Sequence, residues 1–137
     1  MEKHFTYSDT EFERKFSTCE LDPAEFTHEA HLRLAWIHIH KYGIEEALVL
    51  IQKRLQAFVA FVGARDKYNT TLTVAAIKAV YHFKLKSTAD NFKDFIAEFP
   101  RLKYNFKDLL ACHYGVDIYH SEQARKEYIQ PDLIPFD

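Results

Sequence analysis

The feature that most constrains this chain is the segment 27–43, which has a helical pattern and contains half of the eight histidines. Successive residues of an α-helix are about 100° apart, so His28, His31 and His38 are expected on one side. The rest of that side is mainly apolar. The opposite side is polar and consists of Glu29, Arg33, His40 and Lys41. The histidine side is therefore expected to face the interior, where each buried imidazole needs a partner.

Residues that favour turns are rare, since the 137 residues include only three glycines and four prolines. Apolar residues recur at spacings of three and four along most of the chain, which predicts helices. A hydrophobic content of 47% is sufficient for a core at this length. We expect one all-α domain spanning residues 1–137, a bundle of four main helices with short extra helices.

Helix boundaries are indicated by N-capping residues and by glycines. Gly43 and Gly63 are expected to end helices, and the two clearest helices are predicted over 44–62 and 70–85. A further helix is expected over roughly 102–113. Helix starts are expected at Ser8, Thr27, Asn69 or Thr70, Ser87 or Thr88, and Ser121. The later segment 131–133 is interpreted as a structural clasp.

Charge and cysteine content narrow the function classes. The net charge of −2, with scattered lysines and arginines, gives no basic field for nucleic acid. No apolar run approaches the ~20 residues of a membrane span, and the N-terminus has no apolar leader. Cys19 and Cys112 are expected to be reduced core residues in a cytoplasmic protein. The oligomeric state stays open.

Three short motifs are spread along the chain: residues 26–32 read FTHEAHL, residues 68–73 read YNTTLT, and residues 121–125 read SEQAR, followed by PDL at 131–133. Together they resemble the pattern of a family of small, mostly uncharacterised bacterial proteins. The resemblance covers most of the chain and implies an all-α fold in which the first two segments meet. The family pattern often carries His where this chain has Asn69, so a metal site that used that histidine would be incomplete here.

The residues themselves indicate a metal site at His28 and His31. Side chains three apart on a helix reach one point, and their imidazole nitrogens suit zinc or iron. His38 is a weaker candidate for a third ligand. The alternative is that these histidines are hydrogen-bonded core residues. His4, His40 and His120 are expected at the surface.

A second polar group is expected at the start of the 70–85 helix. Tyr68, Asn69 and Thr71 cluster where free N–H groups and the helix dipole attract anions. Together with His28 and His31 they would line a pocket for a metal or a small polar or anionic ligand. Ordinary N-capping by Asn69 is the alternative for that residue.

Two classes of function therefore stay open. The first is a binding protein with a histidine-lined pocket that takes a small molecule or a zinc or iron ion, with or without catalysis. The second is a non-enzymatic structural or protein-interaction module whose buried histidines are only hydrogen-bonded. No Gly-rich phosphate loop, nucleophile elbow or zinc-finger spacing occurs in the sequence.

Overall fold

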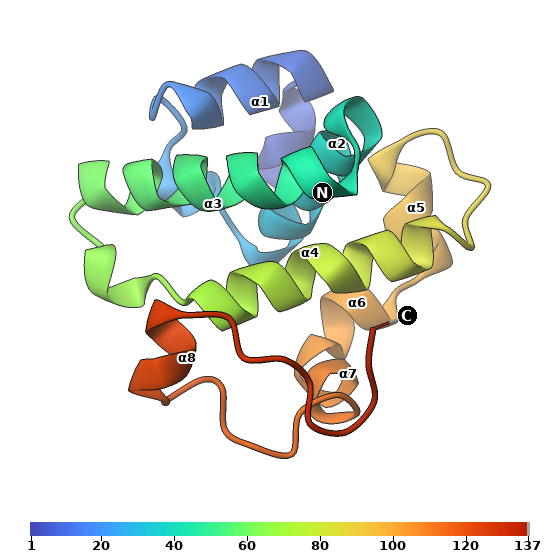
Figure 1. Ribbon diagram of the computed structural model, residues 1–137. Helices are drawn as coiled ribbons and strands as arrows, with labels where there is room; N and C mark the ends of the chain where they lie inside the picture. The colour runs from blue at the N-terminus through green and yellow to red at the C-terminus, as the bar shows by residue number, and fades with distance from the viewer. Residues whose placement is uncertain (137) are drawn as a thin grey trace. The chain divides into compact units, whose positions relative to one another are not determined.

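The computed structural model describes residues 1–136, and the regular elements in that range are all helices (Figure 1). The predicted all-α class, with four main helices and short extra ones, is confirmed. The main helices are α1 (Asp9–Ser17), α2 (His28–Tyr42), α3 (Ile44–Phe61) and α4 (Thr70–Lys84). The short helices are α5 (Phe92–Glu98), α6 (Arg101–Tyr104), α7 (Phe106–Ala111) and α8 (Glu122–Lys126). Single 3-10 turns are η1 (Lys3–Thr6), η2 (Pro23–Glu25) and η3 (Arg65–Lys67).

The chain divides into two compact units, and each is described by itself. The N-terminal unit is Met1–Tyr68, and the C-terminal unit is Asn69–Asp137, of which residues 69–136 are described. The expectation of one domain over 1–137 stays a prediction. No helix of the described chain is both long enough and apolar enough to cross a bilayer.

In the N-terminal unit, α2 and α3 pack against each other, and α1 packs on both. Gly43 alone joins α2 to α3 at a φ of +84°, a left-handed conformation that favours glycine. The predicted caps are confirmed at Ser8, which accepts a hydrogen bond from the Glu11 amide, and at Thr27, which accepts from the Ala30 amide. The start of α2, which carries the histidine motif, is therefore fixed by a side-chain hydrogen bond.

The expectation that α2 buries only its histidine side is wrong. Residues 32–39 are buried without a break, so the middle of α2 is enclosed on all sides. His28 and His31 are exposed, whereas Glu29 and Arg33, expected in solvent, are buried. The reason is tertiary: the segment before α1 supplies hydrogen-bond partners to both charged side chains.

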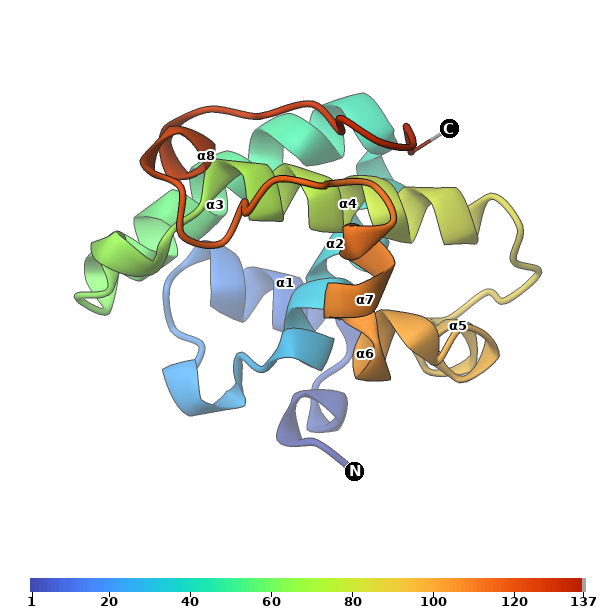
Figure 2. The same ribbon diagram turned by 90° about the horizontal axis from the view of Figure 1, so that it is seen from below.

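In the C-terminal unit, α4 packs against α8, and the two helices lie side by side in both ribbon views (Figures 1 and 2). The predicted 102–113 helix is interrupted at Asn105, which separates α6 from α7. The short helix before them is capped by Asn91 rather than by Ser87 or Thr88, because the Asn91 side chain accepts from the Asp94 amide. Ser121 caps α8 as predicted.

The C-terminal tail is held by hydrogen bonds to the loop after α7. Asp132 accepts from the Gly115 amide at 2.9 Å, and the Leu133 amide donates to the His113 carbonyl at 3.0 Å. The interpretation of residues 131–133 as a structural clasp is confirmed by these two contacts.

Candidate functional site

His4, in η1, is the one histidine of residues 1–68 that lies outside α2. It is fully buried, so the prediction that it lies at the surface is wrong. His40 and His120 are exposed, as expected. His4 is buried because its ring lies against the Phe5 and Phe12 rings, while both ring nitrogens face polar groups. The short turn of η1 thus carries an imidazole to the buried charged residues of α2.

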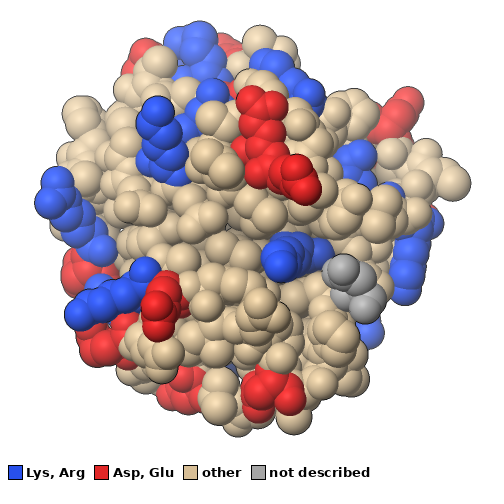
Figure 3. Space-filling model, viewed as in Figure 1, with Lys and Arg blue, Asp and Glu red and all other residues tan. Residues whose placement is uncertain are grey.

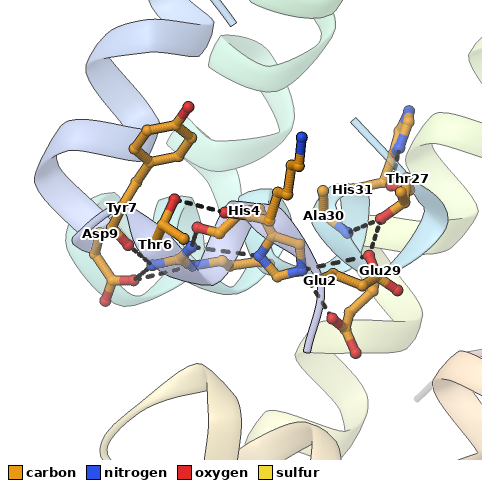
Figure 4. Close-up of polar contacts among 11 residues, drawn as sticks. Glu2, His4, Thr6, Tyr7, Asp9, Thr27, Glu29, Ala30 and His31 are labelled. Atoms are coloured by element: carbon orange, nitrogen blue, oxygen red, sulfur yellow. Dashed lines mark hydrogen bonds and ion pairs between the residues drawn. The ribbon is translucent and has the colours of Figure 1, made fainter. Parts of the chain in front are cut away.

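Two carboxylates converge on the His4 ring (Figure 4). His4 Nε2 donates to Glu29 Oε1 at 2.8 Å, and Glu2 Oε1 lies 3.6 Å from the same nitrogen. One potential ligand atom from each of Glu2, His4 and Glu29 lies within 4.8 Å of the others. These three residues are called the Glu2–His4–Glu29 cluster below.

Arg33 closes the other side of the His4 ring. Its guanidinium donates to the His4 carbonyl at 2.5 Å, to the Tyr7 carbonyl at 2.8 Å, and to Asp9 at 2.9 and 3.2 Å. Arg33 Nη1 also lies 3.3 Å from His4 Nδ1, and a guanidinium can only donate. These partners assign the proton to Nε2 and a lone pair to Nδ1.

The His4 imidazole is neutral at pH 7. Burial lowers the pKa of His4 below its ordinary value of 6.5 and outweighs the raising effect of the Glu29 carboxylate. Arg33 contributes in the same direction as burial, because its positive charge opposes a second one nearby. Neutral imidazole is the form that binds metal ions.

Thr27 connects the cluster to the histidine motif of α2. Its hydroxyl donates to the Glu2 carboxylate and accepts from the Ala30 amide, so one side chain both orients a carboxylate and caps α2. Its carbonyl accepts from His31 Nδ1 at 2.7 Å. A carbonyl at Nδ1 is the usual outer partner of a histidine that binds metal through Nε2.

The predicted metal ligands differ in their surroundings. His31 stacks on the Phe26 ring, and its Nε2 has no hydrogen-bond partner within residues 1–136. His28 is exposed at the first position of α2. His38 has both nitrogens engaged, because Nδ1 donates to the Leu34 carbonyl and Nε2 accepts from Arg54, each at 2.8 Å. The alternative of a hydrogen-bonded core histidine therefore describes His38, whereas ligation by His28 and His31 stays a prediction.

The other three predicted ligand-binding residues lie in different units. Tyr68 ends the N-terminal unit, and its buried hydroxyl has no hydrogen-bond partner within the described part of the chain. Asn69 and Thr71 belong to the C-terminal unit and are engaged there. Asn69 caps α4 through the Leu72 amide and donates to a carbonyl at 2.9 Å. Capping is thus confirmed for Asn69, and a ligand-binding role for Tyr68, Asn69 and Thr71 stays a prediction.

Thr71 fastens α4 to the segment after α8. Its hydroxyl donates to the Glu127 carbonyl at 2.9 Å and accepts from the Ile129 amide at 3.1 Å. A hydroxyl that both donates and accepts has used its proton and one of its lone pairs. The structural contribution of Thr71 is therefore the connection of two segments more than 50 residues apart in sequence.

Glu2, His4, Glu29 and Arg33 were not identified from the sequence. Glu29 and Arg33 are four apart, so they lie on one side of α2, but that pattern is typical of a solvated ion pair. Their partner His4 is 25 to 29 residues away, and no local periodicity connects η1 to α2. The only local signal was Thr27, predicted as a helix cap.

Comparison of the chain with protein-family models, with curated proteins and with solved structures found no match. The resemblance to a bacterial family therefore stays a prediction, and a function has to be argued from the geometry.

On the face shown in Figure 3, Lys and Arg side chains are interspersed with Asp and Glu side chains.

Proposed function

We propose that this chain binds a divalent metal ion, zinc or iron(II), at the Glu2–His4–Glu29 cluster. The observation that carries the proposal is the convergence of one imidazole nitrogen and two carboxylate oxygens within 4.8 Å, from segments 25 residues apart. Mixed nitrogen and oxygen ligands suit these two ions. The motif at residues 26–32, on which the family resemblance rests, contributes Glu29 as a ligand. It also contributes Thr27, whose hydroxyl orients the Glu2 carboxylate.

The position of the cluster supports chemistry as well as binding. Glu29 and His4 are buried, whereas the Glu2 side chain is about one-third exposed, so solvent reaches the cluster from the Glu2 side. Three protein ligands leave a tetrahedral ion one position for water, as in catalytic zinc sites. A metal-bound water would have a lowered pKa, which is the requirement for metal-assisted hydrolysis.

Metal binding through Nε2 would require the single proton of the neutral His4 imidazole to move from Nε2 to Nδ1. Nε2 carries the proton that it donates to Glu29, and the same nitrogen would have to bind the metal. The remaining proton position, Nδ1, faces Arg33 at 3.3 Å, so this contact would have to open. Arg33 would keep its bonds to the His4 carbonyl, the Tyr7 carbonyl and Asp9.

A structural role is the second candidate, and the Arg33–His4 contact favours it. In that role the network of His4, Glu29 and Arg33 only fixes η1 against α2, and the chain is a non-enzymatic structural or interaction module. A network with both nitrogens satisfied has no need of an ion. The two candidates predict opposite results for added zinc.

The test compares two isosteric substitutions at buried carboxylates of the same unit, Glu29→Gln and Glu13→Gln. Glu13 is bonded to Tyr42, Lys41 and Arg54, away from the cluster residues, so it is a matched control. The untagged 137-residue chain is titrated with zinc, and bound zinc and the melting temperature are measured. A ligand that binds only the folded state stabilises it by about 2.7 kcal/mol at 100 times its Kd.

We expect wild type and Glu13→Gln to bind about one zinc per chain and to melt higher with zinc, and Glu29→Gln to show neither effect. Equal zinc binding by all three proteins would overturn the proposed site. If zinc binding survives Glu29→Gln but is lost in a His28→Ala/His31→Ala double variant, the site predicted from the sequence is correct instead. No uptake by the wild type supports the structural role.

A further inference from the structure

A small cleft lies entirely within the C-terminal unit, between the end of α4 and the segments α6 and α7. Its volume is about 250 Å³. His82, Phe83 and Lys86 line it from α4 and the turn that follows, at spacings that place them on one side of the helix. Arg101 and His113 line it from the first residue of α6 and from the turn after α7.

The polar part of this lining is basic. His82, Lys86, Arg101 and His113 contribute to it, and none of the described lining residues is acidic. Within residues 1–136, neither Lys86 nor Arg101 forms an ion pair with a carboxylate. Two cations that lie beside one cleft, with no counterion among residues 1–136, attract an anion.

The remaining lining is mainly apolar and includes Phe83, Leu109 and Phe136. Phe136 stacks on the His113 ring with centroids 4.2 Å apart, and His113 Nδ1 donates to the Ile134 carbonyl at 2.6 Å. These contacts fix one aromatic wall beside the two cations. An ion such as phosphate would leave this apolar surface uncovered.

We infer that the cleft binds a small organic carboxylate with an aromatic or short aliphatic body. The carboxylate pairs with Lys86 and Arg101, and the body packs on Phe83, Leu109 and Phe136. The volume is suitable, because an apolar cavity of about 150 Å³ holds benzene. Arg101 is suited to bidentate carboxylate recognition. This inference does not depend on the metal proposal, which concerns the other unit.

Cys112 is exposed, so the expectation that it is a core residue is wrong. It also lines the cleft, and its thiol therefore provides a direct readout. The second cysteine, Cys19, lies in the other unit and is an internal reference. The 137-residue chain is treated with iodoacetamide with and without 3-phenylpropionate, and alkylation of each cysteine is followed by mass spectrometry. The neutral 3-phenylpropionamide and inorganic phosphate are tested in parallel.

We expect 3-phenylpropionate to slow alkylation of Cys112 and not of Cys19. Arg101→Gln and Lys86→Gln should each raise the half-protecting concentration about tenfold, because each removes a charge-assisted hydrogen bond. Lys93→Gln removes the same charge from an exposed position of α5 outside the lining and should leave protection unchanged.

Three results would overturn the inference. Equal protection by the amide would show that charge is not recognised. Equal protection by phosphate would show that the apolar wall is not used. No selective protection of Cys112 by the carboxylate would show that the cleft does not bind this class. Arg101 and Lys86 are exposed, so circular dichroism of both variants should confirm that the fold is kept.

Discussion

Two buried histidines of the N-terminal unit, His4 and His38, are each paired with an arginine but in opposite orientations. In the first, Nε2 faces the Glu29 carboxylate and Nδ1 faces Arg33. In the second, Nδ1 faces the Leu34 carbonyl and Nε2 faces Arg54. Burial lowers the pKa of both histidines, so both are neutral at pH 7.

The difference lies in the carboxylates. Glu13, the carboxylate of the second network, accepts from Tyr42, Lys41 and Arg54, so its charge is fully engaged by the protein. Glu2 and Glu29 instead converge on one nitrogen of His4. A buried histidine is a candidate metal ligand because of the atoms that converge on it, and burial alone does not make it one.

The largest expected effect on the free energy of unfolding is that of Arg33→Ala, and the matched comparison is Arg54→Ala. Arg33 is buried and donates charge-assisted hydrogen bonds to two carbonyls and to the half-exposed Asp9, so its removal should cost about 3–5 kcal/mol. Arg54 is partly exposed, and its removal leaves Glu13 with other donors, so about 1–2 kcal/mol is expected. Urea unfolding followed by fluorescence of Trp36, the single tryptophan and a buried residue of α2, measures both. Equal losses would contradict the proposed difference between the networks.

The second expected effect concerns Glu13 and acid. Burial raises the pKa of Glu13, but hydrogen bonds from Tyr42, Arg54 and Lys41 outweigh burial and lower the pKa to about 2, from an ordinary 4.5. The Glu13 carboxyl therefore binds a proton less tightly in the folded state than in the unfolded state. Glu13 stabilises the fold fully above about pH 4.5, and this contribution is lost as the pH falls toward 2.

Glu13→Gln should accordingly cost about 2 kcal/mol at pH 7, since it removes charge-assisted hydrogen bonds. The difference in the free energy of unfolding between wild type and variant, measured by urea unfolding at each pH, should decrease as the pH falls from 4.5 to about 3. A difference that is constant over this range would show that the Glu13 charge does not stabilise the folded state.

The sequence predicted what depends on neighbouring residues and failed where distant segments meet. The caps at Ser8, Thr27, Asn69 and Ser121 were found because each binds an amide three residues on. The angular relations within α2 were also correct. The buried and exposed sides of α2 were assigned from the polarity of their residues. This assignment fails when another segment of the chain supplies hydrogen-bond partners that allow charged side chains to be buried. His4 and Asp9 do so for Glu29 and Arg33 across 24 or more residues, and no periodicity encodes that distance.

The smallest expected effect on stability is the loss of a helix cap. Two caps of the N-terminal unit also separate most sharply the two proposed roles of the His4 network, metal binding and a purely structural role. Thr27→Ala and Ser8→Ala each remove a cap of the same unit and should each cost about 1 kcal/mol. Only Thr27 also donates to Glu2, so only Thr27→Ala should weaken zinc binding, by about tenfold. Zinc titration monitored by melting temperature distinguishes the variants. If both lose stability and neither changes zinc affinity, Thr27 caps α2 without orienting a ligand, and the His4 network then resembles that of His38.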